Sequence, residues 1–447
     1  MLVLKRNLPS WINRLLHPTI NTTSITIKRG RTHCCKVLVV GGGTAGIATA
    51  ARLSNLLCKQ ELIIVEPEDI HYYQSCFTWI GAGVKKLHES AEVNLKIFPK
   101  NSIWLRDSVA CFSPINDSVT LESGHVIEYE IMVLAMGVKM DYNKIKGLTM
   151  ALENYRNVST IYSPKYAEKT FSMIKELVAG PAVFTSPNTP VKCLTAPLKI
   201  CYLAQDYLRI NDKLSETSLI FTTADSDLYP VAKYDQLLRK IAKRKRIDLH
   251  LGTNLIEVNP EKREIILECA NNPEHKITLD YTLLHVTPPM SPPQPLQDCK
   301  DLINDEGYVN ADLYTLRHKK FDNIYAVGDC SPGVKNKTTS AISGQSSTVF
   351  ANIKAQLDGK ISEEKYFGYT ACPIITGYDK CILSEYDYSL KEKNTFPYWY
   401  GFESRLMYYV KKYIMPYIYW RLLLRGSWNG TEFLRRILHL DFLRRKR

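Results

Sequence analysis

The residues of this sequence best suited to redox or nucleophilic chemistry are its twelve cysteines. They are scattered along the chain, with no Cys-x-x-Cys motif and no cluster of cysteine and histidine at zinc or iron–sulfur spacing, so we predict no metal site. Cysteines scattered through a long intracellular chain are mostly buried as small apolar residues. Spacing alone does not select a redox pair from among them.

Cys193 is the cysteine whose local sequence favours reactivity. It follows Lys192 directly and lies at the turn into a predicted helix, within the segment NTPVKCLTAP at residues 188–197. An adjacent ammonium group and a helix N-terminus both lower the pKa of a thiol and favour the nucleophilic thiolate. On this local pattern alone, a structural cysteine remains the alternative interpretation.

A dinucleotide-binding fingerprint opens the part of the chain that we expect to fold. Residues 36–40 read as a short buried parallel strand, and Gly41, Gly43 and Gly46 follow in the pattern G-x-G-x-x-G before an alanine-rich helical stretch. A second strand, ELIIVE, ends at Glu66, 20 residues after Gly46. The glycines let a pyrophosphate approach a helix N-terminus, and the carboxylate of Glu66 can accept from ribose hydroxyls. This order of elements predicts a dinucleotide site.

Two later segments favour FAD over NAD as the dinucleotide. YEIMVLAMG, residues 129–137, resembles the strand ending in Ala-Thr-Gly of FAD-binding reductases. FDNIYAVGDC, residues 321–330, resembles their second FAD motif, in which an aspartate matching Asp329 holds the ribityl chain. Because residues 138–320 separate the two segments, we predict an α/β fold with two Rossmann-like dinucleotide-binding domains, the second inserted in the first.

The predicted inserted domain lacks a glycine loop. Its first strand ends near Phe184 and continues into Thr-Ser-Pro-Asn-Thr-Pro, residues 185–190, where NADH-linked relatives carry a second G-x-G-x-x-G. Prolines have no N–H group and stiffen the turn, so this loop is a poor cradle for phosphate. Its composition argues against NAD(P)H as the electron donor.

The positive charge of the protein is concentrated at its two ends. The formal net charge is +13, and residues 1–35 contain six lysines and arginines with no acid, whereas residues 403–447 contain eleven against three acids. The remaining body is close to neutral, so we predict no electrostatic nucleic-acid surface. A basic N-terminus without acids or a long apolar block predicts a mitochondrial transit peptide over residues 1–35, with a plain basic tail as the alternative.

The C-terminal segment predicts an association with a lipid surface. It is rich in tyrosine, tryptophan, leucine and arginine, but Lys411, Lys412, Arg421 and Arg425 interrupt its apolar runs. None of these runs approaches the ~20 apolar residues that a membrane-spanning helix needs. Aromatic and leucine faces flanked by cations suit helices that lie in the membrane interface, so we predict monotopic attachment. A helix packed on a partner subunit is the alternative.

Taken together, these residues resemble the mitochondrial sulfide:quinone oxidoreductases, from about Lys36 to the C-terminus. The resemblance is carried by VGGGTAGI, IVEPEDIHYYQ, NTPVKC, LHVTPPMSPP, VGDC and GYTACPIITGY. It implies an enzyme that oxidises hydrogen sulfide with FAD through a cysteine pair and a persulfide intermediate. It further implies that electrons pass to ubiquinone and sulfane sulfur to a small acceptor such as glutathione or sulfite, at the surface of the mitochondrial inner membrane.

The resemblance also implies which residues form the site. The redox-active cysteines fall on Cys193 and on Cys372, which the sequence places in a short Ala-Cys-Pro turn, and a disulfide or a sulfur bridge joins them in the resting enzyme. Cys76 is interpreted as structural, and Cys111 does not match the third cysteine of bacterial members. Cys201 is a rival partner for Cys193, but a helical spacing of eight residues makes a disulfide between them awkward. The cofactor-binding residues fall on Gly41, Gly43, Thr44, Ala45, Gly46, Glu66, Gln74, Val109, Asp329 and Lys337.

The predicted organisation has five parts. These are a transit peptide (1–35), the first part of an FAD-binding domain (36–148), a second Rossmann-like domain without the NAD glycine motif (149–292), the second part of the FAD-binding domain (293–358), and a C-terminal domain with amphipathic membrane-binding helices (359–447). Two other functions stay open on the sequence: an NADH:quinone oxidoreductase of the same fold, and a non-catalytic FAD-binding membrane scaffold whose cysteines only pack.

Overall fold

The computed structural model describes residues 31–333, 336–362, 364–397 and 401–439. The predicted transit peptide therefore lies almost entirely outside the described residues. The first strand, β1 (Thr32–Val40), already begins inside the range 1–35, because Thr32 pairs in parallel with Val126 of strand β8.

The first sheet carries the predicted glycine turn at its centre. β1 is flanked by β2 (Leu62–Val65) and β8 (Val126–Leu134), and all three are parallel. The outer members are β5 (Ser102–Leu105) beside β2 and the antiparallel pair β6 (Val109–Ser113) and β7 (Ser118–Leu121) beyond β8. Strand β20 (Ile324–Ala326) pairs with β8, so a segment almost 200 residues later in the chain returns to the first sheet, as the predicted insertion requires.

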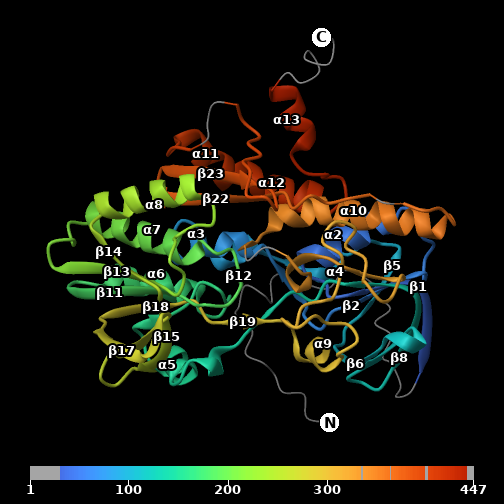
Figure 1. The fold of residues 1–447 in the computed structure, drawn as a ribbon, viewed down its shortest axis with the longest axis horizontal. Helices are drawn as coiled ribbons and strands as arrows, with labels where there is room; N and C mark the ends of the chain where they lie inside the picture. Colours follow the sequence, from blue (N-terminus) through green and yellow to red (C-terminus); the bar gives the residue numbers. More distant parts are fainter. Residues whose placement is uncertain (1–30, 334–335, 363, 398–400, 440–447) are drawn as a thin grey trace.

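The second sheet lies within the predicted inserted domain. Its five parallel strands run in the order β10 (Val158–Ser159), β18 (Leu283–Val286), β11 (Gly180–Ser186), β13 (Thr217–Thr223) and β14 (Ile247–Leu251). A three-stranded antiparallel sheet, β15 (Thr253–Asn259), β16 (Glu264–Cys269) and β17 (Asn272–Asp280), is appended to it. The two parallel sheets lie side by side, each with helices on its upper face in Figure 1.

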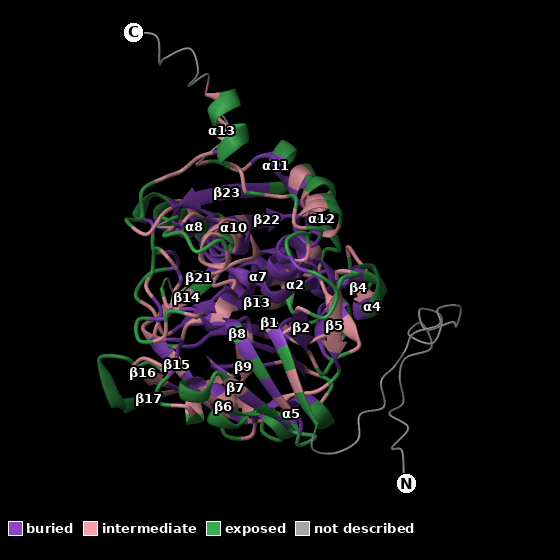
Figure 2. Ribbon diagram, turned by 90° about the vertical axis from the view of Figure 1, so that its right-hand side faces the viewer, coloured by how far each residue is buried: buried purple, intermediate pink, exposed green. Residues whose placement is uncertain are grey.

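Long helices connect the two sheets to the C-terminal part. Over the first sheet lie α2 (Thr44–Leu53) and α10 (Thr339–Leu357), and over the second lie α7 (Ala196–Ile210) and α8 (Ala232–Arg244) (Figure 1). The hairpin of β22 (Thr370–Gly377) and β23 (Lys380–Tyr386) covers these helices, and it is largely buried (Figure 2). Val39 of β1, Phe184 of β11 and Ile374 of β22 are fully buried in one shared hydrophobic core, so the three parts pack as one body.

The chain ends in a series of short helices on the outer side of this hairpin. A nearly continuous helical stretch runs through α11 (Arg405–Tyr409), η6 (Val410–Ile414), α12 (Met415–Ile418) and η7 (Tyr419–Leu423). The last described helix, α13 (Glu432–Leu438), projects from the body and has no buried residue (Figure 2). Among the described residues, no helix is both long and apolar enough to span a membrane.

Candidate active site

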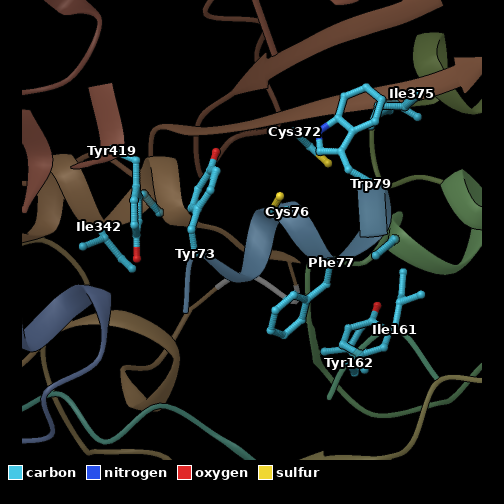
Figure 3. Packing of buried hydrophobic residues seen from close by; sticks show 14 of the residues in the cluster. Tyr73, Cys76, Phe77, Trp79, Ile161, Tyr162, Ile342, Cys372, Ile375 and Tyr419 are labelled. Atoms are coloured by element: carbon cyan, nitrogen blue, oxygen red, sulfur yellow. The ribbon is translucent and has the colours of Figure 1, made fainter. Parts of the chain in front are cut away.

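A single large cavity joins the glycine turn to the two predicted redox cysteines. Its volume is about 570 Å³, within the range of cofactor and ligand sites. Its walls come from the first sheet, from the loop before α7, from β22 and from the C-terminal helices. Figure 3 shows part of this wall, with Tyr73 beside Tyr419 and the sulfur of Cys372 above the turn that follows Tyr73.

Eight of the ten residues predicted to bind the cofactor line this cavity. They are Gly41, Gly43, Thr44, Ala45, Glu66, Gln74, Asp329 and Lys337. Gly46 and Val109 are absent from the cavity wall: Gly46 packs under the turn, where a Cβ atom would lie 1.8 Å from the carbonyl oxygen of Gly41, and Val109 is buried in the core between β6 and β7. For these two positions a role in cofactor binding stays a prediction.

The glycine turn has the geometry that a pyrophosphate requires. Gly41 has φ +105°, and a Cβ atom there would lie 2.5 Å from the carbonyl oxygen of Ala135, so only glycine fits. Glu66 accepts a hydrogen bond from the N–H of Gly42 at 2.7 Å, which fixes its carboxylate at the rim of the turn. Burial raises the pKa of Glu66. A carboxylate has about four lone-pair positions, so Glu66 keeps capacity for ribose hydroxyls. The chain's own residues therefore fit a dinucleotide.

Cys193 is held in an unusual backbone conformation at the other side of the cavity. Its φ is +55°, which few residues other than glycine adopt and which is often found at functional sites. Its N–H donates to the carbonyl oxygen of Lys337 at 2.8 Å, and its own carbonyl accepts from the N–H of Ala196 at 2.9 Å and from the Tyr162 hydroxyl at 3.1 Å. Three hydrogen bonds thus fix the backbone that carries this thiol.

Cys372 lies next to Cys193, although the two are far apart in the sequence. It is in the interior of strand β22 and almost fully buried, so the predicted short turn at this position is wrong. The cause is that β22 pairs only with β23, and a two-stranded hairpin tolerates the neighbouring Pro373. The hydroxyl of Thr195 lies 2.9 Å from the Cys372 sulfur and connects it to the start of α7.

The two thiols have opposite acidities. A hydrogen bond from Cys372 is the main reason that the pKa of Cys193 lies well below its usual value, and the charge of Lys199 lowers it further against the effect of burial. The same hydrogen bond, together with burial, raises the pKa of Cys372. The site therefore holds Cys193 as the thiolate and Cys372 as the protonated donor.

Lys199 is a functional residue that the sequence interpretation missed. Its Nζ donates to the sulfur of Cys193 at 3.1 Å from the first turn of α7. Burial opposes its charge, but the negative charge of the Cys193 thiolate and the hydrogen bond to its sulfur outweigh burial and raise the pKa of Lys199. A signal was present in the sequence, because Lys199 stands between Leu198 and Ile200 in a helix that is buried along most of its length. A buried lysine requires an anionic partner.

The C-terminal helices close the cavity near the glycine turn. The hydroxyl of Tyr419 lies 2.8 Å from Oγ1 of Thr44 and 2.5 Å from Nε2 of His71. Burial lowers the pKa of His71 to about 4, so its imidazole is neutral at pH 7. Lys411, from the same helical stretch, is buried over the ring of Tyr73 and contributes to the low pKa of Cys193. The sequence interpretation assigned none of these contacts.

The other cysteines discussed for the site lie outside the cavity wall. Cys76 is buried beside it, and burial raises its pKa to about 11, which suits the structural role predicted for it. Cys201 is fully buried in α7, and burial raises its pKa as well. Cys111 is exposed on β6. No group of three or more potential metal ligands occurs among the described residues.

Comparisons with known proteins agree with this geometry. A family model described as pyridine nucleotide-disulphide oxidoreductase matches residues 35–178. The mitochondrial sulfide:quinone oxidoreductase of Mus musculus is 38% identical over 91% of this chain and 91% of its own length. The proteins of the same name from Dictyostelium discoideum and Schizosaccharomyces pombe are 35% and 33% identical, over 91% and 89% of this chain and 90% and 92% of their own lengths.

Two solved structures resemble the whole architecture. The sulfide:quinone oxidoreductase of Aquifex aeolicus superposes with a TM-score of 0.76 at 18% identity, covering 92% of this chain and 95% of its own. NDH2 of Plasmodium falciparum in complex with NADH superposes with a TM-score of 0.62 at 12% identity, covering 91% and 98%. At these identities the likeness concerns the fold alone, and it confirms the predicted α/β class with two dinucleotide-binding-like sheets.

Proposed function

The chain belongs to the mitochondrial sulfide:quinone oxidoreductases, and we propose that it oxidises hydrogen sulfide with bound FAD and delivers the electrons to ubiquinone. The observation that carries this proposal is the pair of Cys193 and Cys372 beside the buried ammonium of Lys199, in the same cavity as a dinucleotide turn. A packing role for these cysteines would not require a buried cation that hydrogen-bonds one of them. The pair is therefore suited to sulfur chemistry.

The proposed sulfur step uses the position of Lys199 beside the sulfur of Cys193. In the resting enzyme Cys193 and Cys372 form a disulfide or a sulfur-bridged form, and hydrosulfide attacks the sulfur of Cys372. For the disulfide, the Cys193–Cys372 bond breaks as the new sulfur–sulfur bond forms, so Cys372 becomes a persulfide and Cys193 leaves as the thiolate. Lys199 stabilises this leaving thiolate, because its Nζ already hydrogen-bonds the Cys193 sulfur. Cys193 is the better leaving group because the charge of Lys199 lowers the pKa of its thiol and remains in place when Cys372 no longer carries a proton.

The cycle closes when the sulfane sulfur leaves and the cysteines are oxidised again. A small nucleophile such as glutathione or sulfite takes the outer sulfur of the persulfide and leaves Cys372 as a thiolate. Re-forming the disulfide from two thiolates releases two electrons. FAD, when bound, supplies the two-electron acceptor for this step and passes the electrons on to the quinone. On this chain, Gly41, Glu66 and Asp329 would hold it.

An anaerobic sulfide titration tests the proposal directly. We expect sulfide, with sulfite present as the sulfur acceptor, to bleach the flavin absorbance of the purified enzyme and a ubiquinone analogue to restore it. Replacing Cys193 or Cys372 by serine should abolish the bleaching. Cys381→Ser is the matched control, because Cys381 is equally buried in the same hairpin but lies outside the cavity wall. Near-normal bleaching in both active-site variants would overturn the assignment.

An NADH arm of the same experiment separates the enzyme from an NADH:quinone oxidoreductase of the same fold. The loop after β11 contains Pro187 and Pro190 and no glycine, and Cys193 occupies the approach to the N-terminus of α7. Both features disfavour a bound pyrophosphate at this helix. We therefore expect no bleaching by NADH, whereas rapid bleaching by NADH without sulfide would favour the alternative function.

The C-terminal helices supply the proposed contact with the inner membrane and with ubiquinone. Leu406, Val410, Ile414 and Ile418 line the cavity, and Leu406 and Ile414 are also exposed at its outer side. An apolar route therefore leads from the exterior to the cavity. Exposed aromatic side chains next to lysines are typical of helices that lie in a membrane interface. This supports peripheral, monotopic attachment to the mitochondrial inner membrane.

A further inference from the structure

Helix α7 and strand β22 are joined by polar contacts at both of their ends. At one end, the hydroxyl of Thr195 lies 2.9 Å from the sulfur of Cys372. At the other end, Oδ2 of Asp206 accepts the backbone N–H of Tyr378 at 3.0 Å. The two contacts are about 16 Å apart along the helix and about 20 Å apart along the strand. The helix and the strand therefore run alongside each other over the whole interval between the sulfur site and Asp206.

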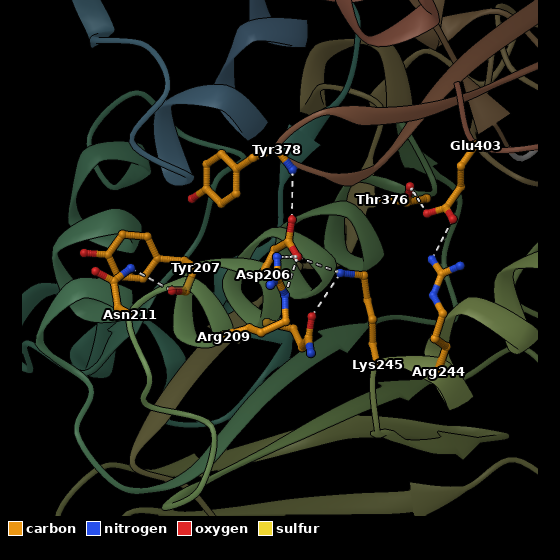
Figure 4. Close-up of polar contacts among 10 residues, drawn as sticks. Asp206, Tyr207, Arg209, Asn211, Arg244, Lys245, Thr376, Tyr378 and Glu403 are labelled. Atoms are coloured by element: carbon orange, nitrogen blue, oxygen red, sulfur yellow. Dashed lines mark hydrogen bonds and ion pairs between the residues drawn. The ribbon is translucent and has the colours of Figure 1, made fainter. Parts of the chain in front are cut away.

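Asp206 is built into a buried polar cluster rather than exposed to solvent. Its Oδ1 accepts from Arg209 at 3.1 Å and from Lys245 at 3.4 Å, and Lys245 also donates to Gln205 at 2.9 Å (Figure 4). Burial alone would raise the pKa of Asp206, but Lys245, the Tyr378 N–H and Arg209 together lower it. The carboxylate is thus charged, and Oδ2 points at the hairpin.

The hairpin approaches Asp206 so closely that a side chain at Gly377 would displace the carboxylate. A Cβ atom on Gly377 would lie 2.7 Å from Oδ2 of Asp206. Gly377 does not have a positive φ, so the steric limit is the carboxylate and not the backbone conformation. The strand is also held from α8, since Glu403 accepts from Arg244 and from Thr376, each at 2.6 Å. Loss of the Asp206 contact would therefore shift the hairpin without releasing it.

We propose that Asp206 is a positioning residue for the sulfur pair: it fixes the register of β22 along α7 and so holds Cys372 against Cys193 and Lys199. Lys199 and Asp206 are seven residues apart, which places them on the same face of α7, so one helix face carries both the ammonium at the sulfurs and the carboxylate at the hairpin. The effect of Asp206 on sulfide turnover rests on the proposed function, whereas its effect on the position of Cys372 does not.

Two variants disrupt the contact by independent routes. Asp206→Ala removes the acceptor, and Gly377→Ala pushes the carboxylate away while leaving every charge in place. Asp235→Ala is the matched control: Asp235 is equally buried on α8 and accepts from Leu228 N–H and Arg239, both at 2.7 Å, but the structure gives it no hydrogen bond to β22. Thermal unfolding of all three reports general destabilisation separately from the effect on the thiols.

The decisive measurements are made on the thiols of the reduced protein, without sulfide. We expect both Asp206→Ala and Gly377→Ala to move the pH profile of Cys193 alkylation upward by about one unit, a tenfold change, because Cys372 no longer donates to the thiolate. Diamide-driven formation of the Cys193–Cys372 disulfide should slow about tenfold or more. Sulfide turnover should fall ten- to hundredfold, as expected for a misplacement of about 1 Å.

Three results would decide against the inference. In the first, both variants keep the alkylation profile and the disulfide rate of the parent protein. In the second, only one of the two variants differs from the parent. Asp235→Ala could shift the thiols as strongly, which would indicate general loosening of the domain. If the unchanged protein failed to oxidise sulfide, the proposed function would fall, yet the two thiol measurements would still decide the role of Asp206.

Discussion

Replacing Lys199 with methionine should raise the pKa of Cys193 and suppress its thiolate at neutral pH. Methionine keeps most of the length and apolar body of the side chain and removes the ammonium. That ammonium is 3.1 Å from the Cys193 sulfur; Lys199 is buried and Cys193 is partly buried. The hydrogen bond from Cys372 and the charge of Lys411 remain in the variant, so the change isolates one of the three favourable influences on the thiolate.

The size of the effect follows from the distance between the charges. Two unit charges 3.1 Å apart attract by about 5 kcal/mol at an effective dielectric constant of about 20. Burial of both ions opposes this attraction, so the net effect should be near the 1–3 pKa units that a close opposite charge usually produces, or about 1.4–4 kcal/mol. Below the inflection, alkylation of Cys193 at a fixed pH should then slow by about 10- to 1000-fold.

The assay is the rate of Cys193 alkylation by iodoacetamide as a function of pH, followed by mass spectrometry of the reduced protein. Because the pKa rises in Lys199→Met, the inflection should move to higher pH, and the rates should converge above it. Lys199→Arg should keep a low inflection, and Lys169→Met serves as a control lysine that donates to the Leu152 carbonyl away from the sulfurs. An unchanged inflection in Lys199→Met would refute the assignment of Lys199 as the thiolate's counter-ion.

Two further changes address the cofactor and the membrane. Glu66→Gln should weaken FAD binding by about 10- to 150-fold, the loss of a charge-assisted hydrogen bond worth about 1.5–3 kcal/mol. Flavin retention in titrations checks this. The control Glu61→Gln alters an ion pair with Lys36 and a hydrogen bond from the Cys58 N–H, both outside the cavity wall, and should retain flavin. Serine replacements of exposed C-terminal tyrosines should reduce flotation with anionic liposomes, whereas Ile115→Ser and Val178→Ser, which change more exposed residues elsewhere on the surface, should not. The tyrosines are Tyr409, Tyr413 and Tyr417. Equal flotation of the tyrosine variant and the parent would contradict the membrane proposal.

The dinucleotide turn could be predicted because its signal is local. Strand, glycine pattern, helix and acid all fall within residues 36–66, and the structure has each of them in that order. The glycine spacing could not, however, show which glycines line the cavity and which only pack inside the fold. Gly41 and Gly43 reach the cavity, whereas Gly46 serves the fit of the helix against the turn, and both roles require the same residue type.

The sulfur pair could not be derived from spacing, because it joins residues from different elements. Thr195 and Cys372 are in contact although 177 positions separate them, and only the family resemblance selected Cys372 from the other cysteines. A functional role for Lys199 could have been suspected, because the residues around it in the helix are apolar. The position of Lys411 over Tyr73 depends on how the last helices fold back on the first sheet, which no local pattern specifies.

The second sheet explains what replaces the lost glycine loop at 185–190. In a nucleotide-binding domain the first strand leads to a helix whose N-terminus stabilises the negative charge of a phosphate. Here β11 leads to α7 in the same order, but the intervening segment carries Cys193, which lies three residues before the helix begins. The thiolate therefore lies next to the end of the helix at which a phosphate would bind. Lys199, in the first turn of the helix, adds a full positive charge. In this segment a thiolate with a lysine counter-ion thus takes the place that a phosphate has in a nucleotide-binding domain.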